Sequence, residues 1–486
     1  MIKRIFTGVL AGIIVILCAG CNKKTENETG VENVVRWYMP ITSTSETTKI
    51  HEKAQEYILE KTGIKTELIP VNVGDYEQKL QMVNASREVY DLSFVSSWMN
   101  FYNNNIRRGS LLDITELIKE YAPNTYKNVP EKFWEAAKYD GKLYGVINQQ
   151  IMARGPVFSI AKRNDNLIKM DFSKYDNFID AADEYLKLAY EYSGGPTKIG
   201  KIYQPIAYGF DEFLAEKAPA VINFNNDKNI KVFNQYESEE FKYAIKKIRE
   251  WQLSGWIPAT DEFKVDNKSF FAKTGENELY PNINVFPTYK PGIEAEQLSN
   301  NNIDLICKMI MPGVVSTYSV TSSLTGVSST SKSPADALKV VEIMNNDKYL
   351  FNLVCYGIEG EHYNKLGENT IEQTDNRYVI NNWAVGNTFN NYLWPNADEN
   401  IWEDTKKLNE DSKMSPIAGF QINLEPIKVE FQNCNSVVAE YLPRFQGGYV
   451  DIETGYAEFI SKLKAAGVDK LIEESQKQID AWLEKK

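Results

Sequence analysis

Histidine is nearly absent from this sequence, since its 486 residues include only His51 and His362. A His-rich metal site is therefore excluded, and a histidine general base has almost no candidates. Positive charge is also in deficit, because 54 Lys and Arg face 66 Asp and Glu, for a formal net charge of -12. This balance opposes binding to phosphate backbones, so no nucleic-acid partner is expected.

Cysteine is scarce as well, with five in the chain. Cys307, Cys355 and Cys434 are an odd and widely spaced set, so they indicate neither a disulfide framework nor a zinc site and allow at most one bridge. No complete phosphate-binding loop or nucleophile elbow is found, and no cofactor is expected. What the chain does have is 43% hydrophobic and 12% aromatic residues, enough to build folded domains.

The N-terminal segment differs from the rest of the chain. A short basic start precedes the apolar run Ile5 to Leu17, which is short for a membrane span but typical of a secretory signal. The run ends in Cys18-Ala19-Gly20-Cys21, which resembles the lipobox of bacterial lipoproteins. Residues 1–20 are then a lipoprotein signal peptide, and Cys21 carries the lipid, palmitate included. The alternative is a plain signal peptide cut at Ala19 or Gly20.

Residues 21–33 are polar and of mixed charge, which predicts a flexible tether. Strand and helix patterns then alternate, with strands at Val34–Met39, Ile64–Val71 and Asp91–Val95 and helices at Glu46–Glu60 and Tyr76–Ser86. This order predicts βαβ units and an α/β fold with a mostly parallel sheet. Ligands at such sheets gather at the carboxyl ends of the strands.

Many short motifs, in a fixed order over nearly all of the mature chain, carry a family resemblance. They include Gly74-Asp75-Tyr76, Ser96-Ser97-Trp98, Phe133-Trp134-Glu135-Ala136-Ala137, Tyr356-Gly357-Ile358-Glu359-Gly360-Glu361-His362-Tyr363, and Ser415-Pro416 with Gly419-Phe420. The chain resembles the extracellular solute-binding lipoproteins of ABC importers, in a subfamily with a C-terminal domain of unknown function. The resemblance implies a two-lobed type II periplasmic-binding-protein fold with hinge crossings, permease subunits as partners and no enzymatic activity.

Two segments are candidates for the hinge crossings. One is the strand-like run Pro156 to Ala161, and the other is the Ser- and Thr-rich extended run Ser316 to Ser329. With these crossings, lobe one is expected at residues 31–155 plus about 319–356. Lobe two is expected at residues 156–318 plus 357–486.

A sugar site combines flat aromatic faces for the C–H faces of the rings with amides, hydroxyls and Arg for the ring hydroxyls. Candidates follow strand ends, precede the proposed crossings or lie in polar surroundings; they are Tyr38, Ser96, Ser97, Trp98, Asn148, Gln149, Gln150, Arg154, Tyr318 and Trp383. The alternatives are that Trp98 packs within its own lobe and that the amides and Arg154 only satisfy backbone groups at the hinge.

The predicted function is capture of a polar solute, best an oligosaccharide, at the extracellular or periplasmic face of the cell membrane, with delivery to an ABC importer. Lipid on Cys21 would hold the protein to the membrane. The sequence is also compatible with a peptide or another polar solute as the ligand. The alternative from another class is a secreted glycoside hydrolase, which needs a carboxylate pair about 5 to 10 Å apart across a groove. A structural adhesin, without an enclosed cleft, is the third class.

Overall fold

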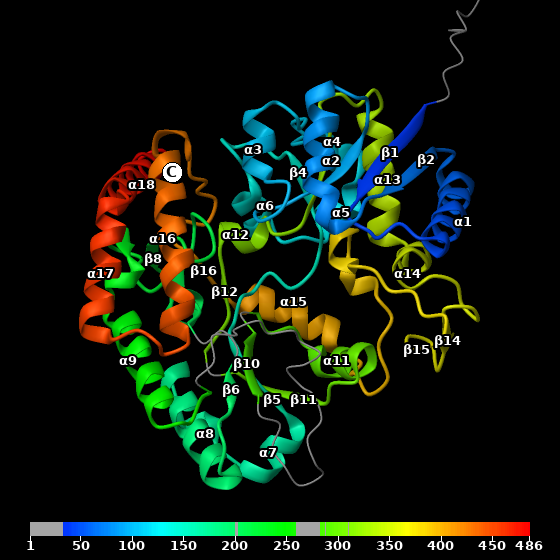
Figure 1. Ribbon diagram of the computed structural model, residues 1–486. Helices are drawn as coiled ribbons and strands as arrows, with labels where there is room; N and C mark the ends of the chain where they lie inside the picture. Colours follow the sequence, from blue (N-terminus) through cyan, green and yellow to red (C-terminus); the bar gives the residue numbers. More distant parts are fainter. Residues whose placement is uncertain (1–32, 200–202, 259–281, 287, 310) are drawn as a thin grey trace, which may run out of the picture.

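The computed structural model describes residues 33–199, 203–258, 282–286, 288–309 and 311–486 (Figure 1). The predicted signal peptide, Cys21 and nearly all of the predicted tether lie outside these residues. Two β-sheets organise the described chain. The first has five strands in the order β2-β1-β3-β13-β4, and the second has four in the order β11-β5-β10-β6. Each sheet carries its own hydrophobic core, so the protein has two α/β lobes.

The sheet of lobe one begins as the sequence predicts. Its strands are β1 Val34–Met39, β2 Lys65–Pro70, β3 Leu92–Val95, β4 Gly145–Ile147 and β13 Leu324–Val327. β1 pairs in parallel with β2 and β3, whereas β13 is antiparallel to both β3 and β4. Four strands therefore run in one direction and β13 in the other, which confirms the predicted, mostly parallel sheet.

Helices cover both faces of this sheet. Successive strand residues point to opposite faces, so Trp37 joins the core under α1 (Ser45–Thr62) and α13 (Pro334–Asn346), while Tyr38 joins the core under α2 (Val73–Ser86). The predicted helix Glu46–Glu60 lies within α1, whose ends are fixed by a capping residue on each side. Thr44 accepts a hydrogen bond from the Thr47 N–H, and Gly63 ends the helix with φ +72°. The other helices of lobe one are α3 Tyr102–Arg107, α4 Leu117–Tyr121, α5 Pro123–Lys127, α6 Glu131–Ala137 and α14 Lys348–Tyr356.

Lobe two places its sheet and a layer of helices around an aromatic core. Its strands are β5 Val157–Ala161, β6 Lys198–Ile199, β10 Asn282–Phe286 and β11 Leu305–Met309, with a smaller sheet of β7 Phe210–Asp211, β8 Ala220–Asn223 and β9 Phe233–Asn234. Its helices are α7 Lys162–Ile168, α8 Phe178–Ser193, α9 Glu239–Leu253, α11 Ile293–Asn301, α16 Lys428–Gln446, α17 Ile452–Ala465 and α18 Val468–Leu483. Phe241 of α9 and Phe459 of α17 are fully buried in this core.

Three segments cross between the lobes side by side. They are the chain at Arg154, β12 (Val314–Val315) and β16 (Lys413–Met414). Arg154 exchanges both backbone hydrogen bonds with the first residue of β12, at 2.7 and 2.9 Å, and β12 pairs in parallel with β16. Gly313 permits this close approach, because a Cβ there would lie 2.8 Å from the Ser412 hydroxyl. The third crossing was not predicted from the sequence.

The predicted second crossing, Ser316 to Ser329, is not one extended run. It contains the helical turn α12 (Thr317–Val320) and the sheet strand β13. The physical reason is a capping box, in which the Ser316 side chain accepts from the Ser319 N–H and the Ser319 side chain accepts from the Ser316 N–H. The predicted first crossing, Pro156 to Ala161, is mostly strand β5 of lobe two, and the chain crosses just before it.

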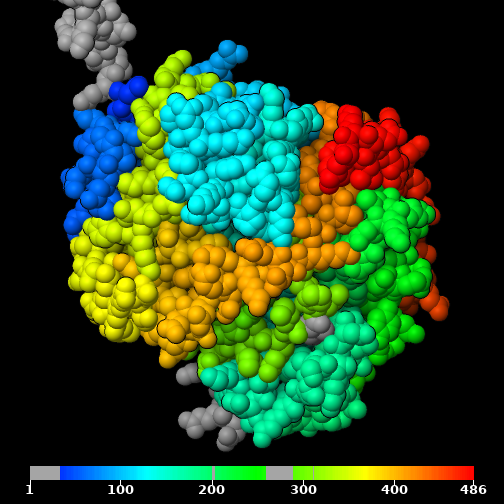
Figure 2. All heavy atoms as spheres, turned by 180° about the vertical axis from the view of Figure 1, so that it is seen from behind, coloured from blue at the N-terminus to red at the C-terminus, as the bar shows by residue number. Residues whose placement is uncertain are grey.

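Residues beyond α14 pack differently from the expected division at residue 356. Tyr363 of β14 (Tyr363–Lys365), Ile371 of β15 (Ile371–Gln373), Tyr392 and Trp394 belong to the hydrophobic core of lobe one. We therefore propose that lobe one continues to α15 (Ile401–Asp411), just before the third crossing. Figure 2 shows this orange segment running between the cyan part of lobe one and the green part of lobe two.

The remaining predictions for the described chain concern cysteines and membrane spans. Cys307, Cys355 and Cys434 are free thiols, and two of them are buried. Within the described ranges, no helix has the length and hydropathy that crossing a membrane requires.

Candidate functional site

A cleft of about 670 Å³ lies between the lobes, beside α12. Figure 1 shows α12 between α6 of lobe one and α16 of lobe two. The cleft is lined by residues of both lobes and of α12 with the residue after it, namely Ser96, Ser97, Phe101, Tyr102, Asn103, Asn104, Arg107, Arg108, Phe213, Leu214, Ala215, Thr317, Tyr318, Thr321, Phe420, Gln421, Ile422, Leu424, Glu425, Lys428, Phe431 and Gln432. Hydroxyls, amides and charged groups thus share one space with phenyl and phenol rings.

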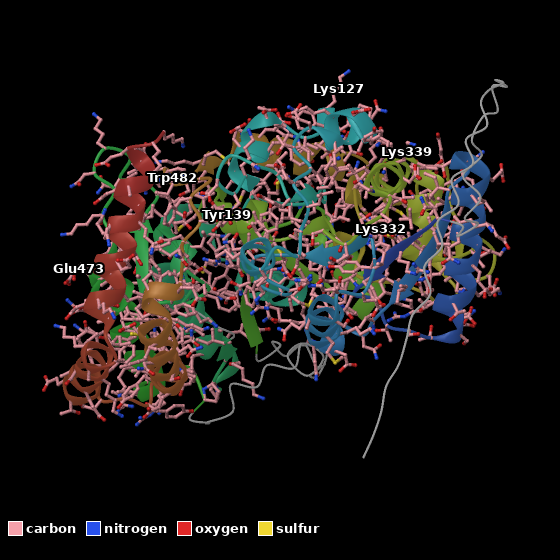
Figure 3. The ribbon with its side chains drawn as sticks, turned by 90° about the horizontal axis from the view of Figure 1, so that it is seen from above. Lys127, Tyr139, Lys332, Lys339, Glu473 and Trp482 are labelled. Carbon is pink, nitrogen blue, oxygen red and sulfur yellow. The ribbon has the colours of Figure 1, made fainter. Side chains whose placement is uncertain are left out.

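Contacts between the lobes flank this cleft. Arg107 of α3 donates to the Ile422 carbonyl at 3.3 Å and to the Asn423 side chain at 3.0 Å, both of lobe two. Gly419 has φ +95°, and a Cβ there would lie 3.3 Å from the Glu135 carbonyl of α6. Seen from above, Trp482 on α18 lies on the lobe-two side of this junction (Figure 3). The cleft therefore sits where the lobes already meet.

Three of the predicted site residues line the cleft: Ser96, Ser97 and Tyr318. Ser96 shapes the loop after β3, because its hydroxyl donates to the Met99 carbonyl and accepts from the Met99 N–H, both at 2.7 Å. The Ser97 hydroxyl donates to the Tyr318 carbonyl at 2.8 Å and so ties this loop to α12. Burial raises the pKa of Tyr318 to about 12, which keeps its phenol protonated and able to donate a hydrogen bond.

The two predicted tryptophans lie together at the surface. Trp98 is 40% exposed, and its ring meets that of Trp383 edge to face with centroids 5.5 Å apart. The Trp98 indole N–H donates to the Ser322 carbonyl at 2.9 Å. Neither ring is among the residues that line the cleft, although Trp98 follows Ser97 directly.

Tyr38 lies in the core and away from the cleft. It is 3% exposed, and its hydroxyl donates to the Glu88 carboxylate at 2.9 Å. Its ring packs edge to face against Tyr90 in the core under α2. In this position its phenol is occupied by a partner of its own lobe.

The amide cluster before the first crossing supports the backbone. Asn148 is buried, donating to the Ser323 hydroxyl at 3.0 Å and accepting from Thr325 at 2.9 Å. The carbonyl oxygens of Gln149 and Gln150 accept from side chains of the chain beyond α14. The Gln149 side-chain nitrogen is buried with no hydrogen-bond partner among the described residues. The contacts of Asn148 and of the Gln149 and Gln150 carbonyls fit the alternative that this segment supports the structure next to the hinge.

Arg154 joins a buried charge cluster at the hinge. Its guanidinium lies 3.6 Å from the Glu212 carboxylate and 5.5 Å from the centre of the Tyr318 ring. A distance of 3.6 Å is an ion pair rather than a hydrogen bond, and this Glu212 oxygen has no hydrogen-bond partner in the described chain. Burial raises the Glu212 pKa to about 7, and the Arg154 charge opposes the shift. Burial likewise raises the pKa of Asp211 to about 6, against its hydrogen bond from Ser415 of the third crossing.

Comparisons with known proteins agree with this geometry. A family model described as "Domain of unknown function (DUF3502)" matches residues 416–484. A Streptococcus pneumoniae protein named "Carbohydrate ABC transporter substrate-binding protein" is 25% identical over 483 residues, 96% of this chain and 94% of that protein. The crystal structure of the N-glycan transport solute binding protein NgtS from S. pneumoniae covers 93% of this chain and 99% of its own, with TM-score 0.79 and 24% identity.

The protein has the two-lobed solute-binding fold. The resemblance to solute-binding proteins of ABC importers is confirmed, with its C-terminal domain of unknown function. A solute-binding protein from Bifidobacterium longum infantis, described as HMO binding and ABC-transporter associated, has the same fold, with TM-score 0.60 and 13% identity over 93% of this chain and 99% of its own.

The phenylalanines Phe213, Phe420 and Phe431 line the cleft and were not predicted from the sequence. Phe213 follows the buried pair Asp211-Glu212, and its ring meets Phe420 with centroids 5.9 Å apart. Phe431 comes from α16. Phe420 lay within a motif that carried the resemblance, but no local pattern marked Phe213 or Phe431, because each is one apolar residue in a segment that also packs in the lobe-two core.

One cluster has the composition of a metal site. Glu46, Glu361 and His362 bring one ligand atom each within 4.8 Å of one another. However, the His362 Nδ1 accepts from the Ile358 N–H at 3.0 Å, so the neutral imidazole carries its proton on Nε2 and donates it to Glu46 at 3.0 Å. The nitrogen that would face a metal therefore already holds a proton. This arrangement favours a structural contact between α1 and the loop after α14.

Proposed function

We propose that the protein captures a neutral oligosaccharide in the cleft between its lobes and delivers it to an ABC importer. The observation that carries the proposal is the position of the cleft. Both lobes and α12, the helical turn that follows crossing segment β12, supply its walls, so a ligand held there contacts both halves of a hinged molecule. A glycoside hydrolase would need no such hinge.

The chemistry of the cleft suits sugar rings. Apolar ring faces can lie against Phe213 and Phe431, while ring hydroxyls meet Asn103, Gln432 and the Tyr318 phenol. A desolvated hydroxyl must be hydrogen-bonded, and amides provide both donors and acceptors. We retain Trp98 and Trp383 as a surface platform beside this site, and Arg154 as a residue that positions the hinge.

The comparisons support an oligosaccharide and a closing motion. Complexes of NgtS with Man1GlcNAc and with Man5GlcNAc have TM-scores of 0.72 and 0.69 with this chain, below the 0.79 of the NgtS structure named without a glycan. A lower score against the same protein in complex is expected if the lobes of that protein move on binding.

The proposal extends to the membrane. Lipid on Cys21 would anchor the mature protein at the extracellular or periplasmic face, behind the signal peptide of residues 1–20. A tether of a dozen residues reaches about 20 Å as a flexible coil. The lobes would then stay close to the permease subunits that receive the solute.

A thermal-shift titration tests the binding step. Man1GlcNAc and Man5GlcNAc, added to the purified protein, are expected to raise its melting temperature, since a ligand at a hundred times its Kd stabilises by about 2.7 kcal/mol. Chromatography of the recovered glycans should show them intact. An unchanged melting temperature with both glycans would contradict the proposal, and cleaved products would favour the hydrolase instead.

A further inference from the structure

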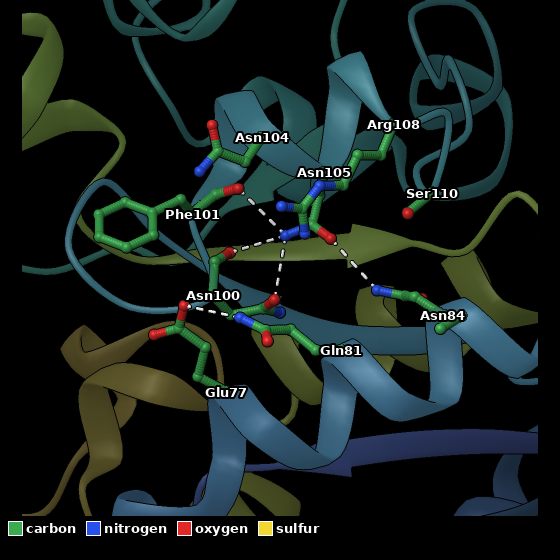
Figure 4. A pocket seen from close by; sticks show the side chains of 10 residues that line it. Glu77, Gln81, Asn84, Asn100, Phe101, Asn104, Asn105, Arg108 and Ser110 are labelled. Carbon is green, nitrogen blue, oxygen red and sulfur yellow. Dashed lines mark hydrogen bonds between the residues drawn. The ribbon is translucent and has the colours of Figure 1, made fainter. Parts of the chain in front are cut away.

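A second hollow, here named the side pocket, adjoins the cleft on lobe one (Figure 4). It has a volume of about 340 Å³ and lies between α2 and the segment from Asn100 through α3. Glu77 and Gln81 form its wall on α2, and Phe101 and Arg108 face them from the other segment. Nothing in the function proposed above uses this pocket.

The floor of the side pocket is a fixed network of amides. The Asn105 side-chain nitrogen donates to the carbonyl oxygen and to the side-chain oxygen of Asn100, both at 3.0 Å. Asn84 of α2 in turn donates to the Asn105 side-chain oxygen at 3.2 Å. Asn100 adopts φ +47°, and its side chain donates to the Phe94 carbonyl at 2.8 Å. These bonds hold the floor in one shape before any ligand arrives.

The side chains at the rim of the side pocket, unlike the amides of its floor, have groups left to contact a ligand. The Phe101 ring is 41% exposed and presents a flat apolar surface. Gln81 donates to one oxygen of the Glu77 carboxylate at 3.1 Å. Arg108 makes no ion pair or side-chain hydrogen bond within the part of the chain that the structure describes. A ring face, an acceptor and a strong donor therefore surround one small space.

Phe101, Asn104 and Arg108 line both the side pocket and the cleft. These three residues form a ridge between the two spaces. A chain of linked sugar rings that leaves the cleft over this ridge meets the side pocket directly. The opposite charges of Glu77 and Arg108 balance, which favours a neutral ring over an acidic one.

We propose that the side pocket binds a second, neutral sugar ring of the same oligosaccharide that occupies the cleft. This inference rests on the proposed function and specifies its ligand as an extended or branched glycan that crosses the ridge. Hydroxyls of the second ring would donate to Glu77 and accept from Arg108, while its C–H face lies against Phe101. The side pocket would then discriminate long glycans from short ones.

Isothermal titration with Man1GlcNAc and Man5GlcNAc tests this inference. Gln81→Trp fills the side pocket with an indole from an exposed position of α2, and Met82→Trp, at a 56% exposed position that does not line it, is the matched control. We expect Gln81→Trp to raise the Kd for Man5GlcNAc at least about tenfold, the effect of losing one hydrogen bond to a charged group. The Kd for Man1GlcNAc and both values for the control should stay at wild type.

A second variant, Glu77→Ala, keeps the test open if the indole disturbs folding, and melting temperatures of all variants verify the fold. It should show the same selective loss for Man5GlcNAc. Equal affinity of the variants and wild type for Man5GlcNAc, or an equal loss for both glycans, would overturn the side pocket while the proposed function stands. Failure of the wild-type protein to bind either glycan would overturn the proposed function itself.

Discussion

Glu212 shows how a single buried residue can make the stability of the fold depend on pH. Its carboxyl is enclosed at the hinge, where Arg154 is its nearest cation. Because its folded pKa of about 7 exceeds the ordinary value of 4.5, the folded state binds a proton more tightly than the unfolded state. This group therefore adds stability that is fully present below pH 4.5 and is lost as the pH rises through about 7.

Glu212→Gln is expected to remove this contribution. Between pH 4.5 and about pH 7, the free energy of unfolding of the wild type should decrease because of this group, and the variant should show a flatter profile. Urea unfolding at several pH values measures it. Glu473→Gln, an exposed carboxyl of α18 that does not contribute to the Glu212 shift, is the control and should keep the wild-type slope. Identical profiles for Glu212→Gln and the wild type would show that the burial of Glu212 does not act this way.

Trp98 has contacts that fit both of its alternatives, because its ring is 40% exposed and also packs edge to face against Phe94 and Trp383. Its exposed ring can stack on a sugar, and an aromatic platform is worth about 1 to 3 kcal/mol, by analogy with base stacking. Trp98→Ala should therefore weaken glycan binding about ten- to a hundredfold with little change in melting temperature. Tyr349→Ala, an exposed aromatic of α14, is the control. A collapse in melting temperature with normal affinity of the folded protein would instead identify Trp98 as a packing residue.

At the scale of elements, local pattern predicted lobe one well at its start. The ends of β1 agree with the prediction, and β2, β3, α1 and α2 agree within three residues, because short apolar strands and helices with a periodic apolar face leave a strong local signal. The prediction failed at Ser316 to Ser329, where Ser and Thr suggested extended chain but the serine hydroxyls cap a helical turn. It also failed to find β16, since two residues of strand leave no periodicity.

The three crossing segments, at Arg154, β12 and β16, depend on Gly313 for their close packing. In Gly313→Ala, the new methyl group would lie 2.8 Å from the Ser412 hydroxyl and 3.3 Å from the Ala153 side chain, so the Ser412 side chain or the crossing segments must shift. Overpacking of this kind costs about 1 to 3 kcal/mol of unfolding free energy. Chemical unfolding should show this loss, while Gly367→Ala, with open space at its Cβ, should unfold as the wild type does. Equal stabilities would mean that the crossing segments tolerate a side chain at position 313.

For the whole molecule, the anchor proposal makes a separate prediction. Cys21→Ser removes the thiol that would carry the lipid, and stable anchoring needs more than one acyl chain. The variant should appear in the medium or remain unprocessed, and immunoblots of membrane and medium fractions measure this. A processed variant found in membranes at the wild-type level would refute the lipoprotein assignment.

The set of residues that line the cleft was the hardest feature to predict from the sequence. Ser97, Tyr318 and Phe213 line one space although they are distant in the chain, and they meet only because three crossings bring the lobes together. Strand ends did mark Ser96 and Ser97, because ligand sites follow the carboxyl ends of strands. The same rule selected Tyr38, whose side chain points to the face that α2 covers.

Small-angle scattering during a glycan titration tests the central claim, that the lobes close over an oligosaccharide. Man5GlcNAc is added to the full mature protein while its binding is followed by calorimetry. The radius of gyration should decrease with the same saturation curve as the calorimetric signal, because closure brings the two lobes together. A radius of gyration that stays constant while binding saturates would contradict closure of the cleft.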